Sequence, residues 1–361
     1  MTRITIPWWR ASFGEDEISA IGRAIRNEHI SMGPLTRELE AKFANLLKVQ
    51  HAVVFPSGSV ALFASMMALG IRPNDEVIMP DRTWVATANA PMMLGARPVL
   101  VDVRAHAPLI DVSRIEKKIT KKTKIILPVH LSGRDSDMKA IMEIAEKHNL
   151  AVVEDACQAL FSRSKSGLLG TMGDIGCFSL GVTKLISTGQ GGIATTNNRA
   201  TAEKLRLIRS NGTLDNINPK YTLLGCNFKF TDMQAAMGIV QLSKSREKIR
   251  HLNGLYGHYT DGLGGLDTVK IVPVDIRAGE VPLYFDVLCK DRDRLAKYLS
   301  GKGIETRPAL PGLHIVPYIK SSENFSNADV FSSQGLVLPC GTAQPPENVE
   351  RAIRAIRKFK N

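Results

Sequence analysis

A lysine and an upstream aspartate are the residues of this sequence whose types and spacing most directly suggest chemistry. Lys184 follows the apolar segment 175–180, and Asp155 follows the apolar run 151–153, 29 residues before the lysine. A lysine amine forms a Schiff base with the aldehyde of pyridoxal phosphate, and a carboxylate keeps the ring nitrogen of that cofactor protonated. The pair therefore predicts a pyridoxal-phosphate enzyme, with Lys184 as its catalytic residue and Asp155 as the partner of the ring nitrogen.

Small and polar residues near this pair fit the same cofactor. Gly58 and Ser59 follow an apolar strand and open a helix, where backbone N–H groups and the helix N-terminus attract a phosphate. The hydroxyl of Ser179 can bind the same phosphate, and Gln158 can reach the phenolic oxygen of the ring. Each feature also has an ordinary structural interpretation, since Ser57 can simply cap the helix and the aspartate can form a salt bridge or cap a helix.

Trp84 and the surroundings of Lys184 complete the predicted site. Trp84 follows the strand at 76–80, and an aromatic ring there can stack on a flat cofactor or pack in the core. Apolar and glycine-rich neighbours bracket Lys184. Because burial disfavours a charged amine, they predict a lowered pKa for this lysine.

The elements that must position these residues alternate between strand and helix patterns. Seven apolar segments predict strands, at 51–55, 76–80, 98–101, 124–129, 151–154, 175–180 and 192–195. Helical periodicity lies between them, at 60–69, 85–94, 112–119, 137–148 and 202–209. This alternation is typical of an α/β fold with a mostly parallel sheet covered by helices, and such sheets bind ligands at the carboxyl ends of their strands.

The remaining sequence predicts a second domain. An apolar stripe at 232–250 predicts a long bridging helix, and the glycine-rich segment 254–265 predicts turns. The tail then predicts a smaller α+β domain, with a strand at 282–289 and helices at 291–299 and 346–359. We therefore expect a large cofactor-binding domain at 1–250 and a small C-terminal domain at 251–361.

Composition narrows the function classes. The five cysteines form no CxxC pair and the eight histidines no HExxH motif, so neither a metal site nor a disulfide framework is expected. No apolar run approaches the ~20 residues that span a membrane, and no signal-peptide pattern opens the chain, which favours a cytoplasmic enzyme. The net charge of +12 suits either nucleic acid or an anionic small substrate. Because no aromatic residues accompany the basic runs, we expect no nucleic-acid partner.

A resemblance to a known family joins these features. Matching segments cover almost the whole chain, at 33–34, 57–62, 75–80, 83–87, 95–99, 128–130, 154–159, 173–179, 191–192, 224–228 and 231–232. In these segments and their order the chain resembles the DegT/DnrJ/StrS sugar aminotransferases, a branch of the fold-type-I pyridoxal-phosphate enzymes. Some members carry histidine in place of the lysine and are dehydratases, so the presence of Lys184 implies transamination.

The resemblance also implies roles and partners. Trp84 would stack on the ring, and Asn227 would reach the phosphate of the neighbouring subunit in a homodimer with shared active sites. His314 and Arg307 would lie on the substrate side. The implied reaction moves an amino group from an amino acid, with glutamate expected, to a nucleotide-linked keto-deoxysugar.

Two other functions remain open at this stage. The ketone can instead belong to a cyclitol or a small phosphorylated compound. Alternatively, the chain can be a non-catalytic, cofactor-binding regulatory protein whose positive charge serves nucleic acid.

Overall fold

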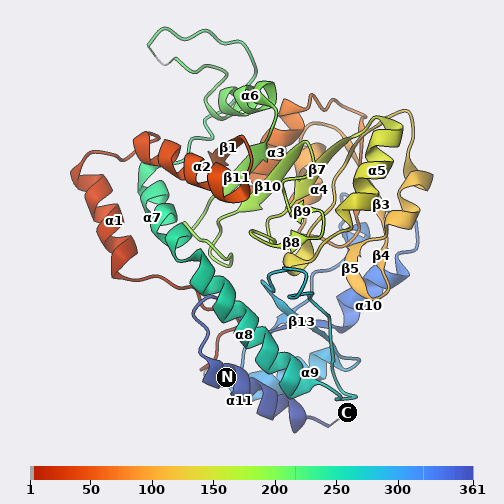
Figure 1. The fold of residues 1–361 in the computed structure, drawn as a ribbon. Helices are drawn as coiled ribbons and strands as arrows, with labels where there is room; N and C mark the ends of the chain where they lie inside the picture. Colours follow the sequence, from red (N-terminus) through yellow and green to blue (C-terminus); the bar gives the residue numbers. More distant parts are fainter. Residues whose placement is uncertain (1–3, 216, 320, 361) are drawn as a thin grey trace.

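A seven-stranded sheet forms the centre of the molecule. The computed structural model describes residues 4–215, 217–319 and 321–360. The strand order is β1, β11, β10, β7, β6, β2, β3 (Figure 1). The strands are β1 (His51–Phe55), β2 (Glu76–Pro80), β3 (Arg97–Val101), β6 (Thr123–Ile126), β7 (Ala151–Asp155), β10 (Ile175–Ser179) and β11 (Gly192–Thr196). All seven segments predicted as strands are confirmed, each within a few residues of its expected bounds.

The direction of the strands brings candidate residues to one edge of the sheet. Strands β3, β2, β6, β7 and β10 run parallel, whereas β11 is antiparallel to both β10 and β1. The predicted mostly parallel sheet is thus confirmed. Since β1, β2, β7 and β10 share one direction, the residues at their carboxyl ends meet at the same edge.

Helices cover both faces of this sheet. On one face lie α3 (Gly58–Ala68), α4 (Ala86–Met92) and α6 (Arg199–Arg209), and on the other lie α2 (Pro34–Leu47), α5 (Met138–His148) and α7 (Asp232–Ser243). Successive strand side chains point to opposite faces. In β7, Val153 therefore packs in the first layer and Val152 in the second.

Two of the predicted elements are wrong. The helix expected at 112–119 is a pair of short 3-10 turns, Val112–Arg114 and Glu116–Lys118. Ile115 is the only fully buried residue of that segment, so no apolar stripe holds an α-helix there. The turns expected at 254–265 are helical as far as residue 263, because α8 (Ser245–Leu263) continues beyond the predicted end of the bridging helix.

Packing explains why α8 tolerates one of its glycines, Gly262. The helix lies against α11 (Pro346–Arg357), and a Cβ on Gly262 would lie 2.7 Å from Cγ2 of Ile353. Close approach to α11 therefore compensates for the low helix propensity of glycine. α7 and α8 are separated only at Lys244, so the long helix predicted there is two consecutive helices.

The C-terminal part contains a second, antiparallel sheet. Its order is β12 (Lys270–Ile271), β13 (Phe285–Leu288), β15 (Gly335–Leu338) and β14 (Arg307–Pro308), flanked by α9 (Arg292–Gly301). The N-terminal segment joins this part, since Ile6 pairs with Ile304 and Trp9 with Cys340. α8 runs through residue 250, and the division into 1–250 and 251–361 stays a prediction.

Shorter elements complete the described chain. They are α1 (Glu15–Arg26), β4 (Val103–Arg104), β5 (Ala107–Ile110), the 3-10 turn Leu131–Gly133, β8 (Arg163–Ser164), β9 (Gly167–Leu168), the 3-10 turn Leu313–Ile315 and α10 (Ser326–Gln334). None of the helices in the described ranges has the length and apolar character that crossing a membrane requires.

Candidate active site

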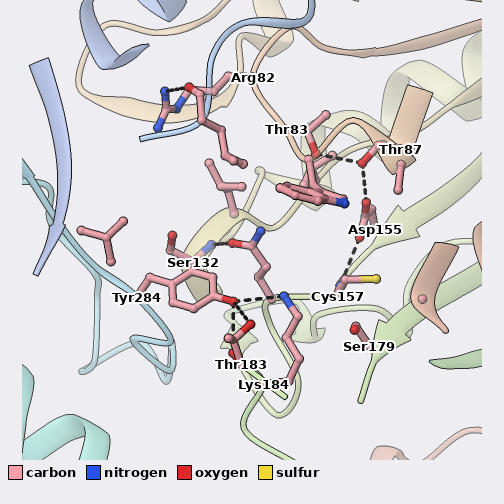
Figure 2. Close-up of a pocket in the computed structure, with 18 of the residues that line it drawn as sticks. Arg82, Thr83, Thr87, Ser132, Asp155, Cys157, Ser179, Thr183, Lys184 and Tyr284 are labelled. Atoms are coloured by element: carbon pink, nitrogen blue, oxygen red, sulfur yellow. Dashed lines mark hydrogen bonds between the residues drawn. The ribbon is translucent and has the colours of Figure 1, made fainter. Parts of the chain in front are cut away.

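A cavity of about 520 Å³ opens at the carboxyl edge of the large sheet. Residues that follow β1, β2, β7 and β10 form one wall, and residues from the two ends of the chain form the other. The structure brings most of the predicted site residues to this cavity: Gly58, Ser59, Trp84, Asp155, Gln158, Ser179, Lys184 and Arg307. Figure 2 shows the central residues of the site.

Asp155 is a buried carboxylate held by neutral donors. It ends β7 and is 5% exposed. Oδ2 accepts a 2.7 Å hydrogen bond from the Thr87 hydroxyl, and Oδ1 accepts one of 3.1 Å from the Cys157 N–H (Figure 2). Within the part of the chain that the structure describes, Asp155 forms no ion pair. A buried charge without a counter-charge is costly, so a cationic N–H in the cavity would stabilise this carboxylate.

The residues after β1 form a cradle for an anion. Ser57 caps α3, where its hydroxyl oxygen accepts a 3.2 Å hydrogen bond from the Val60 N–H. The N–H groups of Gly58 and Ser59 lie in the first turn of that helix, where backbone donors have no partner inside the helix. A Cβ on Gly58 would lie 2.8 Å from the Cys157 sulfur, so a larger residue here would force Cys157 to shift.

Gln158 and Trp84 offer two further contacts to a flat ring, a hydrogen-bond donor and an aromatic face. Oε1 of Gln158 accepts a 2.9 Å hydrogen bond from the Ser132 N–H, which leaves the amide nitrogen to donate into the cavity. Trp84 lines the cavity and is 58% exposed, unlike a core residue. The core-packing interpretation of this tryptophan is therefore wrong for the single chain.

Lys184 lies in the turn between β10 and β11, and its Nζ donates a 3.2 Å hydrogen bond to the Tyr284 hydroxyl. Desolvation in the cavity lowers the pKa of this lysine. Tyr284, Cys157 and Asp155 outweigh that effect, so the pKa lies above its ordinary value. The lowered pKa predicted from the apolar sequence context is wrong, because that context does not include the groups that tertiary folding brings near Nζ.

Two predicted residues lie outside the cavity of the single chain. Nδ1 of His314 contacts Oδ2 of Asp81 at 2.8 Å, and the imidazole stacks on Phe325. Burial raises the pKa of the Asp81 carboxyl, although hydrogen bonds from His314 partly oppose this. The histidine thus lies against a carboxylate behind the cavity wall, and its expected place on the substrate side is not supported. Asn227 is exposed on the long α6–α7 loop and also does not line the cavity.

The structure adds residues that the sequence did not single out: Trp8, Arg82, Thr83, Thr87, Ser132, Cys157, Thr183 and Tyr284. Arg82 is the second residue after β2, and a charged residue after an apolar strand is a signal that was available in the sequence. Burial lowers the pKa of Arg82 to about 10, and its Nη1 donates to the Leu310 carbonyl at 2.8 Å. Tyr284 had no such signal, because it is distant from Lys184 in the chain.

Metal chemistry has no support in the described residues. No group of three or more His, Cys, Asp or Glu side chains there has an arrangement that could hold a metal ion.

The fold and the site together define a class of protein. A lysine and a buried aspartate at the carboxyl edge of a mostly parallel α/β sheet form the arrangement of an α/β aminotransferase. The model of the DegT/DnrJ/EryC1/StrS aminotransferase family matches residues 11–357, and the chain belongs to this family.

Individual relatives agree with the family. The chain is 35% identical over 334 residues to GDP-perosamine synthase of Caulobacter vibrioides, covering 90% of each protein. It is 32% identical over 361 residues to GDP-perosamine synthase of Escherichia coli O157:H7, covering 98% of each. The solved structure of DesV from S. venezuelae matches with a TM-score of 0.93 and 30% identity, covering 100% of both chains. The chain is thus an enzyme of the sugar aminotransferase type.

Proposed function

We propose that this enzyme uses pyridoxal phosphate to move an amino group from an amino acid, with glutamate as the expected donor, to the ketone of a nucleotide-linked keto-deoxysugar. One observation carries the proposal: the Lys184 amine lines the same cavity as the buried Asp155 carboxylate, which forms no ion pair with any residue that the structure describes. Two relatives named for a GDP-linked sugar support the choice of acceptor.

The described residues fit this cofactor. Asp155 has the buried charge that a protonated ring nitrogen would neutralise, and Trp84 offers a ring face. The amide nitrogen of Gln158, whose oxygen is already engaged by Ser132, would donate to the ring oxygen. Gly58, Ser59 and Ser179 would hold the phosphate at the N-terminus of α3.

Asp155 and Lys184 would have different roles in the reaction. When bound, pyridoxal phosphate supplies an electron sink next to the carbon that carries the amino group. Asp155 keeps the positive charge of that sink in place. Lys184 would hold the cofactor through Nζ and, when released as an amine, would take the proton from the α-carbon of the amino donor and pass it on to the cofactor. In the second half-reaction Nζ would take a proton back from the cofactor and deliver it to the corresponding carbon of the acceptor.

The substrate and the second subunit would approach from the open side of the cavity. Arg307 lies there, half-exposed and 3.3 Å from Glu305, and suits the diphosphate of a nucleotide sugar. The α6–α7 loop, which projects from the body in Figure 1, exposes Leu214, Ile217, Tyr221 and Leu224. We propose that this loop packs on a second copy of the chain, so that Asn227 reaches the phosphate of the partner's site.

The experiment that tests the acceptor is a panel of ketones offered to the cofactor-loaded enzyme with glutamate, with products read by mass. The panel contains keto-deoxysugar nucleotides, the same sugars without nucleotide, a keto-cyclitol and a small phosphorylated ketone. We expect efficient amination of a nucleotide-linked member only. Equal turnover of the cyclitol would favour that alternative. A salt-dependent shift on DNA, with no turnover of any ketone, would favour the regulatory protein.

A further inference from the structure

The phenol of Tyr284 contacts the catalytic lysine and its neighbour at once. Oη lies 3.2 Å from Lys184 Nζ, 3.0 Å from the Thr183 carbonyl oxygen and 3.0 Å from the Thr183 hydroxyl (Figure 2). Tyr284 immediately precedes β13 in the C-terminal part, whereas Lys184 follows β10 of the large sheet. The contact therefore joins the second sheet to the residue that performs the chemistry.

Counting protons fixes the direction of these hydrogen bonds. A phenol has one hydrogen to donate and lone pairs to accept with. The carbonyl oxygen of Thr183 can only accept, so the phenol proton points to it. Oη then presents lone pairs to Lys184, and the lysine must be the donor. Such a bond is strongest when the donor is an ammonium group.

Aromatic packing fixes the position of the phenol. The Tyr284 ring lies 6.0 Å from the Trp8 ring and 5.7 Å from the Trp9 ring, measured between centroids. Nε1 of Trp9 donates a 3.1 Å hydrogen bond to the Val182 carbonyl, two residues before Lys184. The N-terminal segment thus ties the tyrosine to the turn that carries the lysine, and Oη is held in place rather than free to swing away.

We propose that Tyr284 is a positioning residue for Lys184, whose phenol oxygen accepts a hydrogen bond from Nζ, holds the released amine in the cavity and stabilises the ammonium group that forms when Nζ takes up a proton. This inference rests on the proposed function for its meaning in the reaction. Within each half-reaction Nζ is an amine before it takes a proton from one carbon and an ammonium group until it delivers that proton to another. An acceptor fixed beside Nζ keeps that proton on the lysine and keeps the amine in reach.

The other groups that face Nζ act on the same equilibrium. Asp155 and Cys157 also favour the ammonium form, and desolvation opposes it. Removal of the phenol oxygen alone therefore leaves part of this support, and we expect a shifted pKa rather than a neutral lysine.

The test measures the proton on Lys184 directly. Full-length protein without added cofactor is trace-labelled with acetic anhydride from about pH 6 to about pH 10, and acetylation of the Lys184 peptide is measured by mass. Tyr284→Phe should lower the pKa of Lys184 by about one unit, so that acetylation below that pKa becomes about tenfold faster. Tyr298→Phe is the matched control, because its ring packs on Phe359 and it does not line the cavity.

A second variant gives an independent test if Tyr284→Phe does not fold normally. Trp9→Leu removes the lateral packing and should shift the labelling profile in the same direction by a smaller factor. Labelling profiles of Tyr284→Phe and wild type that coincide, in proteins with equal Tm, would overturn the proposal. Because labelling needs neither cofactor nor turnover, a failure of the proposed aminotransferase reaction would leave the predicted shift intact, and the two failures are distinguishable.

Discussion

The two walls of the cavity are built in different ways. The strand-end wall consists of residues at or after the ends of strands of the large sheet, among them Asp155 and Gln158. Asp155 is held by a hydrogen bond from Thr87 at the start of α4, and Gln158 by one from Ser132 in the 3-10 turn 131–133. The chain-end wall consists of Trp8, Tyr284 and Arg307, which come from the N-terminal segment and the second sheet. Long-range packing alone brings this second wall to the cavity.

The difference indicates that the two walls have different tasks, cofactor binding at the strand-end wall and substrate recognition at the chain-end wall. Parallel strands fix the strand-end wall to the geometry of the sheet, which suits a cofactor whose ring must be held the same way in every turnover. The chain-end wall includes the exposed Arg307, which suits substrate recognition. Changes in the strand-end wall should therefore reduce kcat, and changes at the exposed part of the chain-end wall should increase KM.

The largest effect is expected at Lys184. Lys184→Ala removes the group that transfers the proton, and kcat should fall by at least about 10³-fold. The variant should still bind pyridoxal phosphate noncovalently, since the rest of the strand-end wall is unchanged. Cofactor content by absorbance and turnover by product mass check both statements. Wild-type turnover in this variant would remove the lysine from the mechanism.

The next largest effect is expected at Asp155, the proposed partner of the cofactor's ring nitrogen. Asp155→Asn keeps the shape of the side chain but removes the charge that stabilises a protonated ring nitrogen. We expect kcat to fall by at least about 100-fold, the scale of losing one main electrostatic interaction. Steady-state kinetics of the folded variant measures this. An unchanged kcat would mean that another group partners the ring nitrogen.

A subunit-mixing experiment tests whether Asn227 of a second subunit contributes to the active site. Lys184→Ala and Asn227→Asp proteins should each be inactive, and a one-to-one mixture that exchanges subunits should recover about a quarter of wild-type activity. Half of the dimers are then hybrids, and one site in each hybrid has both wild-type residues. Activity of the mixture and sedimentation of the protein are the measurements. No recovery despite proven exchange would exclude the shared site.

The smallest effect is expected at the mouth of the chain-end wall. Arg307→Ala should increase KM for the nucleotide sugar roughly threefold to tenfold and leave kcat nearly unchanged, because an exposed charge contributes mainly to binding. Raising the salt concentration should have the same effect on the wild type. Lys302→Ala is the control, since Lys302 does not line the cavity. A fall in kcat without a change in KM would place Arg307 in the chemistry instead.

The local sequence pattern was sufficient to predict the strands that position the strand-end wall. It was not sufficient to predict the end of α8 or the surroundings of His314. The apolar segments of the large sheet are visible in the sequence because each strand is buried on both faces. The glycines of α8 predict turns because the sequence does not show that this helix packs on α11, most closely at Gly262. His314 was predicted to lie on the substrate side because the sequence does not show the contact between its imidazole and the Asp81 carboxylate.

The sequence by itself determined the seven strands of the large sheet, the edge at which their ends meet, and that Lys184 and Asp155 lie at one site, since each of these follows from local apolar pattern and short spacing. Only the tertiary structure decided what surrounds that pair. Tyr284 contacts Lys184 across 100 residues of chain, and the pKa of the lysine rises where local context predicted a fall. Electrostatics at a buried amine depends on every group within a few ångströms, and folding alone brings those groups together.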